Sequence, residues 1–253
     1  MAMVRFLNPS HPEFRRRMDA DYWDPQYTEL QKALLAMPGV RRLGDFLPAG
    51  RIVTAHKGIV RYQPEGIPLL TARNLVPTGI DWGSEMRCVQ PNGPADPPRS
   101  RLIEGDVLLV RSGVGCAGEC AVVRLDGRAV NVRSELYILR PVGLDPYVLL
   151  ALLKSQAVRM QMQRLLCGVG TINLSQPEIR SLLIPVPGEA MQGEIRERME
   201  DAARCHEQAM ALKPRAKVAS IWTNRFNELR YTEKLHEAEE RLAGAVALLE
   251  RRV

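Results

Sequence analysis

The chain has 253 residues, which is enough for one large domain or for one domain with an appendage. Hydrophobic residues make up 45% and charged residues 25%, a composition typical of a soluble globular protein with a packed core. No apolar run reaches the roughly 18 residues of a membrane span, and residues 1–17 lack the apolar centre of a secretory signal. The five cysteines follow no disulfide pattern, so we expect a cytoplasmic protein.

The net charge of +6 resides entirely in the middle of the chain. Residues 41–187 carry 18 lysines and arginines against 12 aspartates and glutamates, whereas residues 1–40 (5 against 5) and residues 188–253 (12 against 12) are balanced. Sixteen of these 18 basic residues are arginines, whose planar guanidinium fork matches phosphates and guanine edges. The excess favours a DNA-facing segment, and a generally arginine-rich composition is the alternative interpretation.

Residues 1–40 predict a polar N-terminal segment that ends in a short helix. Asp24 is placed to cap this helix, and Pro25 suits its first turn. Pro38 followed by Gly39 ends it.

Residues 41–187 consist of short apolar runs separated by glycine and proline. Their lengths and β-branched residues predict strands at 67–70, 107–110, 121–123 and 136–139. Four prolines within residues 91–98 predict a loop. Residues 145–166 predict one helix, with Asp145 as its N-cap and Pro146 in its first turn.

Residues 188–253 predict helices, because apolar residues recur there at intervals of three and four. Pro214 interrupts the pattern, and an apolar stretch around Trp222 and Phe226 follows it. The last stretch, from Leu235 to Val253, has a period close to about 3.5 residues. We interpret it as a coiled-coil-like arm that binds a partner, and a helix folded back on the domain is the alternative. The expected fold class is α+β: a mixed α/β domain with mostly short strands, then a long helical arm.

A glycine-rich loop raises the possibility of nucleotide binding. Gly113, Gly115 and Gly118 form a G-x-G-x-x-G directly after the apolar run at 107–110. A dinucleotide site needs a helix to begin inside this loop, so that its N-terminal amides meet the pyrophosphate. The following residues instead predict another strand and a turn, which argues against a dinucleotide.

Other catalytic patterns are incomplete. Residues 96–99 resemble the D-P-P-aromatic motif of amino-methyltransferases, but Arg99 replaces the aromatic residue. Cys116 and Cys120 have a possible zinc spacing without a second pair, and the serines lack a nucleophile-elbow context. We therefore expect a non-catalytic protein with no cofactor or metal of its own.

Several segments together resemble one protein family. They are residues 17–27 (RMDADYWDPQY), 66–75 (GIPLLTARNL), 105–118 (GDVLLVRSGVGCAG), 147–168, 171–187 and the Q-x-x-I at 192–195. Each is weak alone, but six in the correct order along nearly the whole chain resemble the specificity subunit of type I restriction-modification systems. The family's usual subunit has two target-recognition domains, each followed by a long helix. This chain has one of each, so it resembles half a subunit.

The resemblance implies that the chain reads double-stranded DNA and positions a separate adenine methyltransferase subunit, which would use S-adenosylmethionine. In complete systems a restriction motor subunit joins them. A half-subunit implies a homodimer through the C-terminal helices, which would read a bipartite site with inverted half-sites. The three parts are then an N-terminal helical segment (1–40), a target-recognition domain (41–187) and a dimerisation and methyltransferase-binding arm (188–253). An interaction scaffold whose basic domain binds protein or RNA is the alternative.

Polar residues at predicted strand ends and loops are the candidate DNA contacts. Arginine and asparagine donors there could reach base edges or phosphates, and serine and threonine hydroxyls could join them. The candidates are Arg73, Asn74, Arg111, Ser112, Arg133, Thr171 and Asn173, with Lys57 and Arg61 as contacts to phosphate only. For each arginine, a surface salt bridge is the alternative.

Overall fold

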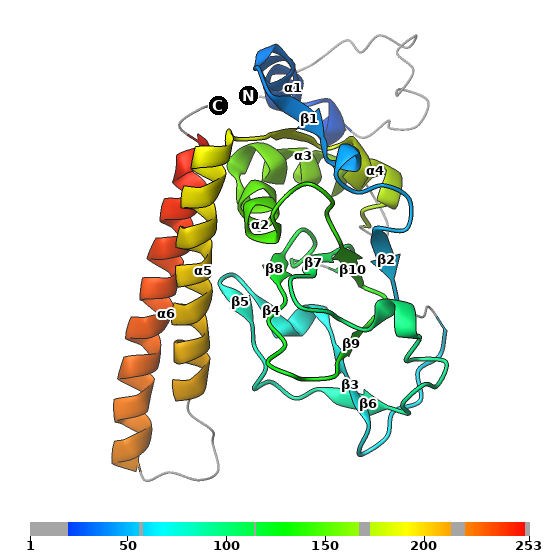
Figure 1. Ribbon diagram of the computed structural model, residues 1–253, viewed down its shortest axis with the longest axis vertical. Coiled ribbons are helices and arrows are strands. Elements are labelled where there is room, and N and C mark those ends of the chain that lie inside the picture. Colours follow the sequence, from blue (N-terminus) through cyan, green and yellow to red (C-terminus); the bar gives the residue numbers. More distant parts are fainter. Residues whose placement is uncertain (1–19, 56–57, 114, 167–172, 214–220, 251–253) are drawn as a thin grey trace.

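The computed structural model describes residues 20–55, 58–113, 115–166, 173–213 and 221–250 (Figure 1). It joins a mixed α/β domain of short strands to a long pair of C-terminal helices, which confirms the α+β fold expected from the sequence. In Figure 1 the helix pair runs along one side of the domain, and the shorter helices cover its upper end.

The domain is built around a four-stranded antiparallel sheet. In spatial order its strands are β2 (Ile52–Thr54), β10 (Leu136–Leu139), β7 (Val107–Val110) and β8 (Cys120–Val122). In β7, Val107 and Leu109 join the core beneath the helices, whereas Leu108 and Val110 join the core on the other face. Both faces are buried, which explains why β7 and β10 are unbroken apolar runs. Three predicted strands belong to this sheet; two have the predicted bounds, and β8 lies one residue earlier.

A second sheet packs on the face of the first that points away from the helices. Its order is β6 (Arg87–Val89), β3 (Ile67–Leu70) and β9 (Asn131–Val132). Strands β3 and β9 are parallel, with Leu70 opposite Val132, and both residues join the core that holds Leu108. The strand predicted at 67–70 is confirmed. The chain continues from it through η3 (Ala72–Asn74) into a small hairpin of β4 (Leu75–Val76) and β5 (Gly79–Ile80).

The N-terminal segment closes the domain at its upper end. It comprises η1 (Ala20–Trp23), α1 (Pro25–Ala36), β1 (Val40–Arg42) and η2 (Leu43–Asp45). The predicted cap of α1 is confirmed, because Asp24 Oδ1 accepts a hydrogen bond from the Gln26 N–H at 3.0 Å. Strand β1 pairs antiparallel with β11 (Leu183–Pro185), so the two ends of the segment 41–187 lie side by side.

The helix predicted at 145–166 is wrong as a single element, because it is divided at Ser155 into α2 (Pro146–Lys154) and α3 (Gln156–Leu166). The Ser155 backbone is extended, and its N–H and Oγ both donate to the Leu152 carbonyl, at 3.1 and 2.7 Å. A serine hydroxyl that bonds to the backbone competes with helical hydrogen bonds in this way. The predicted cap is confirmed, since Asp145 Oδ1 accepts from the Tyr147 N–H at 2.8 Å. A short helix, α4 (Gln176–Ser181), precedes β11.

The C-terminal helices α5 (Glu189–Leu212) and α6 (Ile221–Glu250) pack antiparallel on each other (Figure 1). Ala245 and Leu249 of α6 lie in one core with Ile195 and Met199 of α5. Buried residues of α2 belong to the same core. At Ala245 and Leu249, α6 folds back on its own chain, as in the alternative interpretation, and the binding of a partner by the arm stays a prediction. Residues 214–220, and with them Pro214, lie outside the described residues, as do the side chains of residues 221–226.

Polar contacts fasten α5 to the β4–β5 hairpin. His206, buried on α5, has Nδ1 2.9 Å from Thr78 Oγ1 and Nε2 3.0 Å from the Ile80 carbonyl oxygen. A neutral imidazole satisfies both contacts, because Nε2–H donates to the carbonyl while Nδ1 accepts from the hydroxyl. Gly79 makes room for the ring, since a Cβ at that position would lie 2.6 Å from His206 Cδ2. An ion pair between Lys213 and Asp81 adds to this junction.

We predict that folding stability falls as the solution is acidified from neutral pH through about 6.5. Burial lowers the pKa of His206 below its ordinary value of 6.5, although the bond to Ile80 opposes this shift. Below about pH 6.5 the unfolded chain therefore binds a proton at this histidine that the folded chain does not. The free energy of unfolding falls by up to about 1.4 kcal/mol for each unit by which the two pKa values differ. Thermal unfolding between pH 8 and 5 measures this decrease, and His206→Gln should reduce its slope. Equal slopes in the two proteins would show that protonation of His206 does not contribute to the pH dependence of stability.

Candidate nucleic-acid interface

Four of the predicted DNA contacts come together where β7 and β9 end and β10 begins. Arg111 and Ser112 directly follow β7, and Arg133 follows β9. The Arg111 N–H donates to the Glu135 carbonyl at 2.9 Å, because β10 begins opposite the end of β7. Asn173 pairs with Ser112 as an antiparallel bridge. We call this place, with the residues that contact it, the strand-end surface.

Arg111 is held over an aromatic ring and has donors to spare. Its guanidinium carbon lies 5.3 Å from the centroid of the Tyr137 ring, and Nη1 lies 3.4 Å from the Tyr137 hydroxyl. Its Nε is enclosed but makes no hydrogen bond with any described residue, and no described carboxylate forms an ion pair with it. The enclosed Nε cannot meet an external ligand, whereas Nη2 is neither enclosed nor bonded to a described residue and is available to an acceptor such as a phosphate or a base.

Arg133 connects this surface with two residues that were not predicted from the sequence, Tyr62 and Arg87. The guanidinium carbons of Arg87 and Arg133 lie 5.0 and 5.9 Å from the centroid of the Tyr62 ring. Arg133 Nη1 also donates to the Tyr62 hydroxyl, and its Nε lies 3.6 Å from Glu135 Oε2. One local signal in the sequence could have indicated this cluster: Arg61 adjoins Tyr62, so that a basic residue stands next to an aromatic one.

The remaining candidates fall into three groups. Arg61 and Arg73 are exposed and pair with no described carboxylate, so their side chains are available to a ligand. Lys57 and Thr171 lie outside the described residues. The prediction for Asn74 is wrong: its side chain is 1% exposed, and its Oδ1 accepts from the Thr71 N–H and hydroxyl, both at 2.9 Å. Asn74 braces the backbone beside Arg73 instead of facing solvent.

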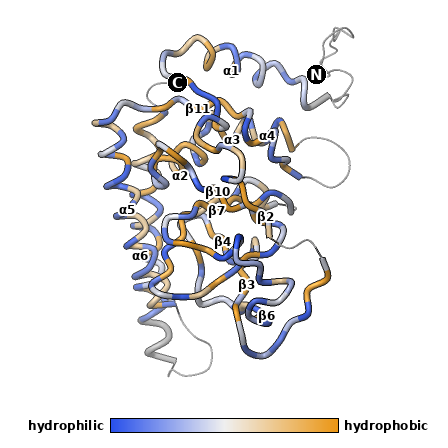
Figure 2. Tube along the Cα trace, turned by 45° about the vertical axis from the view of Figure 1, so that its right-hand side comes forward, coloured by the Kyte–Doolittle hydropathy of each residue, from blue (hydrophilic) through white to orange (hydrophobic). Residues whose placement is uncertain are grey.

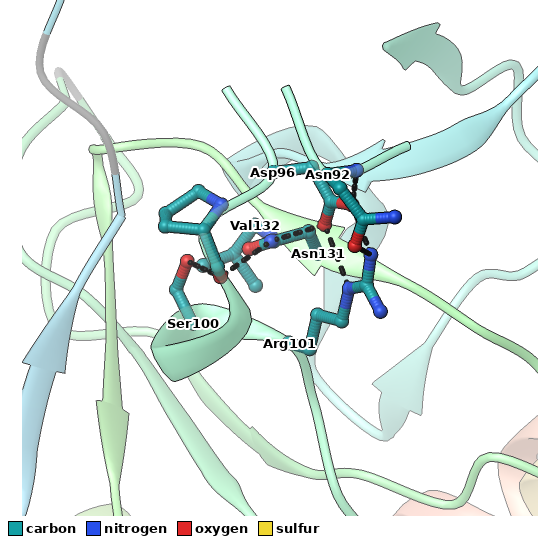
Figure 3. Close-up of polar contacts among 7 residues, drawn as sticks. Asn92, Asp96, Ser100, Arg101, Asn131 and Val132 are labelled. Atoms are coloured by element: carbon teal, nitrogen blue, oxygen red, sulfur yellow. Dashed lines mark hydrogen bonds and ion pairs between the residues drawn. The ribbon is translucent and has the colours of Figure 1, made fainter. Parts of the chain in front are cut away.

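A buried carboxylate holds the proline-rich loop against β9, directly before Arg133 (Figure 3). Asp96 is fully buried, and its Oδ1 accepts from Asn131 Nδ2 at 2.8 Å and from Arg101 Nε at 3.1 Å. Its Oδ2 accepts from the Asn92 N–H at 2.8 Å. Burial raises the pKa of Asp96, but the bonds from Arg101 and Asn131 outweigh it and hold the pKa below its ordinary value. Asp96 is the first residue of the methyltransferase-like motif, and in this structure it has a structural role.

The glycine-rich loop is the turn of a β-hairpin between β7 and β8. Gly113, Gly115 and Gly118 all have positive φ, and the Gly118 N–H donates to the Val110 carbonyl at 2.8 Å. The strand expected after the loop is β8. Without a helix at this point, the loop offers no helix N-terminus for a pyrophosphate.

Among the residues that the structure describes, no three histidine, cysteine, aspartate or glutamate side chains gather as metal ligands. None of the described helices is long and apolar enough to cross a membrane.

Comparison with known proteins gave matches among solved structures only. No protein-family model and no curated protein matches the sequence. A structure described as the basis of assembly and conformational transition of the type I R-M system is 16% identical, with a TM-score of 0.48 over 88% of this chain and 53% of that one. The type I S subunit from M. genitalium is 15% identical, with a TM-score of 0.43 over 69% and 43% of the two chains. The HsdS subunit from Thermoanaerobacter tengcongensis is 18% identical, with a TM-score of 0.43 over 92% and 53%. This chain spans about half the length of the solved chains it matches.

We predict that Asp96→Ala lowers the free energy of unfolding by about 1–3 kcal/mol, because it removes the buried acceptor of Asn131 and Arg101 and leaves the Asn131 amide only the Pro97 carbonyl at 3.4 Å. Chemical denaturation measures the change. Glu194→Ala is the control, since it removes an exposed carboxylate that pairs with Arg198 on α5 and should change stability by less than about 0.5 kcal/mol. Equal effects of the two substitutions would contradict the structural role of Asp96.

Proposed function

We propose that this chain is the DNA sequence-recognition subunit of a restriction-modification or related phage-defence complex. It binds a specific duplex site and positions a separate adenine methyltransferase, which supplies S-adenosylmethionine chemistry, while this chain is not itself catalytic. The observation that carries the proposal is the strand-end surface, where arginines with unused donors gather on a rigid sheet.

The pairing of arginines differs between the strand-end surface and the helix pair. On α5 and α6, arginines pair with carboxylates three or four residues away, as in Arg196–Glu200, Arg198–Glu194 and Arg241–Glu237. On the strand-end surface, Arg61, Arg73, Arg87 and Arg111 have no such partner among the described residues. Positive charge without local neutralisation attracts a polyanion and favours DNA as the ligand.

The fold also suits direct contact with a duplex. The strand-end surface is anchored by β7 and β10, whose residues are almost all fully buried. A rigid scaffold holds the arginine forks in fixed directions, as base recognition requires. RNA or an acidic protein is the alternative ligand, and binding competition between ligands distinguishes these possibilities.

The helix pair is the proposed attachment surface for the methyltransferase, for a restriction motor in complete systems and for a second copy of the chain. Leu229 on α6 is 66% exposed, far more than a leucine in a packed helix pair. Because α5 already has α6 as its antiparallel neighbour, a homodimer forms through the outer faces of the pair. Two identical domains related by a two-fold axis then read inverted half-sites of a bipartite sequence.

We predict that Arg111→Ala weakens duplex binding about tenfold, because it removes a guanidinium contact worth about 1–3 kcal/mol. Fluorescence anisotropy with the purified full chain and duplexes carrying selected sites measures the loss, and a salt titration should show a shallower dependence if the contact is to phosphate. Arg42→Ala is the matched control, since Arg42 is an exposed arginine on β1 at the opposite end of the domain from β6 (Figure 1). Equal affinities of the wild-type protein and Arg111→Ala would contradict the proposed role, and tighter binding to RNA of the same sequence would favour the alternative function.

We predict that Leu229→Glu weakens self-association, because it places a charge in an apolar contact. Sedimentation velocity over a range of protein concentrations should show a dimer for the wild-type chain and a shift toward monomer for the variant. Glu228→Gln, on the adjacent exposed position, is the control. A wild-type chain that is monomeric at all concentrations would rule out the homodimer.

A further inference from the structure

Arg87 presents an unoccupied guanidinium fork in a fixed orientation. Arg87 lies at the start of β6 with its side chain exposed, and none of its guanidinium donors bonds to a described residue. Its guanidinium carbon lies 5.0 Å from the centroid of the Tyr62 ring. Stacking of this kind restricts a long side chain without using its hydrogen-bond donors.

Tyr62 is itself held in place from two sides. The next residue, Gln63, donates its N–H to the Cys88 carbonyl at 2.9 Å, so the backbone beside Tyr62 is joined to the backbone beside Arg87. Arg133 donates to the Tyr62 hydroxyl, and the Arg133 N–H donates to the Leu70 carbonyl at 2.8 Å. The ring beneath Arg87 is therefore tied to β6 and to the end of β3.

The surroundings of Arg87 match a base edge better than a phosphate. Its neighbour Tyr62 presents an aromatic ring that is 39% exposed. Ile59, three residues before Tyr62 in the chain, is 93% exposed, and Figure 2 shows an apolar (orange) section of the chain after the grey residues 56–57. Apolar and aromatic groups gain nothing beside a phosphate, whereas they fit the thymine methyl groups in the major groove of a duplex.

We propose that Arg87 is a specificity-determining residue that recognises a guanine in the major groove, and that Tyr62 is its positioning residue. Two guanidinium donors of Arg87 bond to guanine O6 and N7, the pair of acceptors that this fork fits. The ring of Tyr62 holds the fork in place before DNA arrives, which reduces the entropy lost on binding. This inference rests on the proposed function, since it requires that the strand-end surface binds DNA.

The test is enrichment of binding sites from a pool of randomised duplexes by the purified full chain. We expect the wild-type protein to enrich a site with at least one invariant guanine in each half. Arg87→Ala should lose about tenfold in preference at that guanine and keep the rest of the site. Arg87→Lys should not restore the preference, because an ammonium group is not a bidentate fork. Tyr62→Leu should weaken the preference at the same position.

Controls separate this inference from the proposed function. Arg42→Ala should enrich the wild-type site unchanged. If Arg87→Ala also enriches that site, or if it weakens binding to all sequences equally, as a phosphate contact would, the inference is wrong and the proposed function stands. If the wild-type chain enriches no duplex sequence, both are wrong. Thermal unfolding of each variant confirms that it is folded before its binding is compared.

Discussion

Strands β7 and β10 pair antiparallel with Val110 opposite Leu136, and side chains on both faces of this pair are buried. This register places the residues after β7 beside the residues before β10, which is why Arg111 meets Glu135. Slippage by one residue would exchange the side chains that β7 contributes to the two cores, and the close packing of both cores opposes such an exchange. The position of the strand-end surface follows from this constraint.

The second sheet extends that surface. Because β3 and β9 are parallel, the chain leaves both strands at the same edge, and Arg73 and Arg133 follow these ends. The buried Asp96 carboxylate accepts a hydrogen bond from Asn131 of β9, so a buried polar network fixes the backbone near Arg133. The candidate contacts Arg111 and Arg133 thus stand on backbone whose N–H groups bond within the protein, to the carbonyls of Glu135 and Leu70.

Some parts of this structure could be predicted from the sequence because their signals are local. The unbroken apolar runs at 107–110 and 136–139 predict strands buried on both faces, and Asp24 and Asp145 cap helices through residues only two positions away. The packing of α6 could not be predicted in the same way. A heptad pattern is the same whether the partner helix belongs to another chain or, as for Ala245 and Leu249, to the same one.

The candidate site could be predicted only in part, for a similar reason. Arg111 and Ser112 follow a strand predicted from the sequence, so their place at a strand end could be anticipated, whereas the two-residue strand β9 before Arg133 was not predicted. Asn74 also follows a predicted strand, but its side-chain oxygen accepts hydrogen bonds from the Thr71 N–H and hydroxyl in a capping interaction. Tyr62 and Arg87 are far apart in the chain and meet only because Gln63 bridges to Cys88, a contact that no local pattern reveals.

Site-specific photocrosslinking can determine whether DNA lies on the strand-end surface. A photoreactive amino acid replaces either Arg61, in the segment beside Tyr62, or Arg42, on β1 at the other end of the domain, and each protein is irradiated with duplex DNA that it binds. If DNA lies on the strand-end surface, we expect crosslinks to DNA from position 61 and none from position 42. Crosslinks from position 42 alone, or equal crosslinks from both positions, would contradict it.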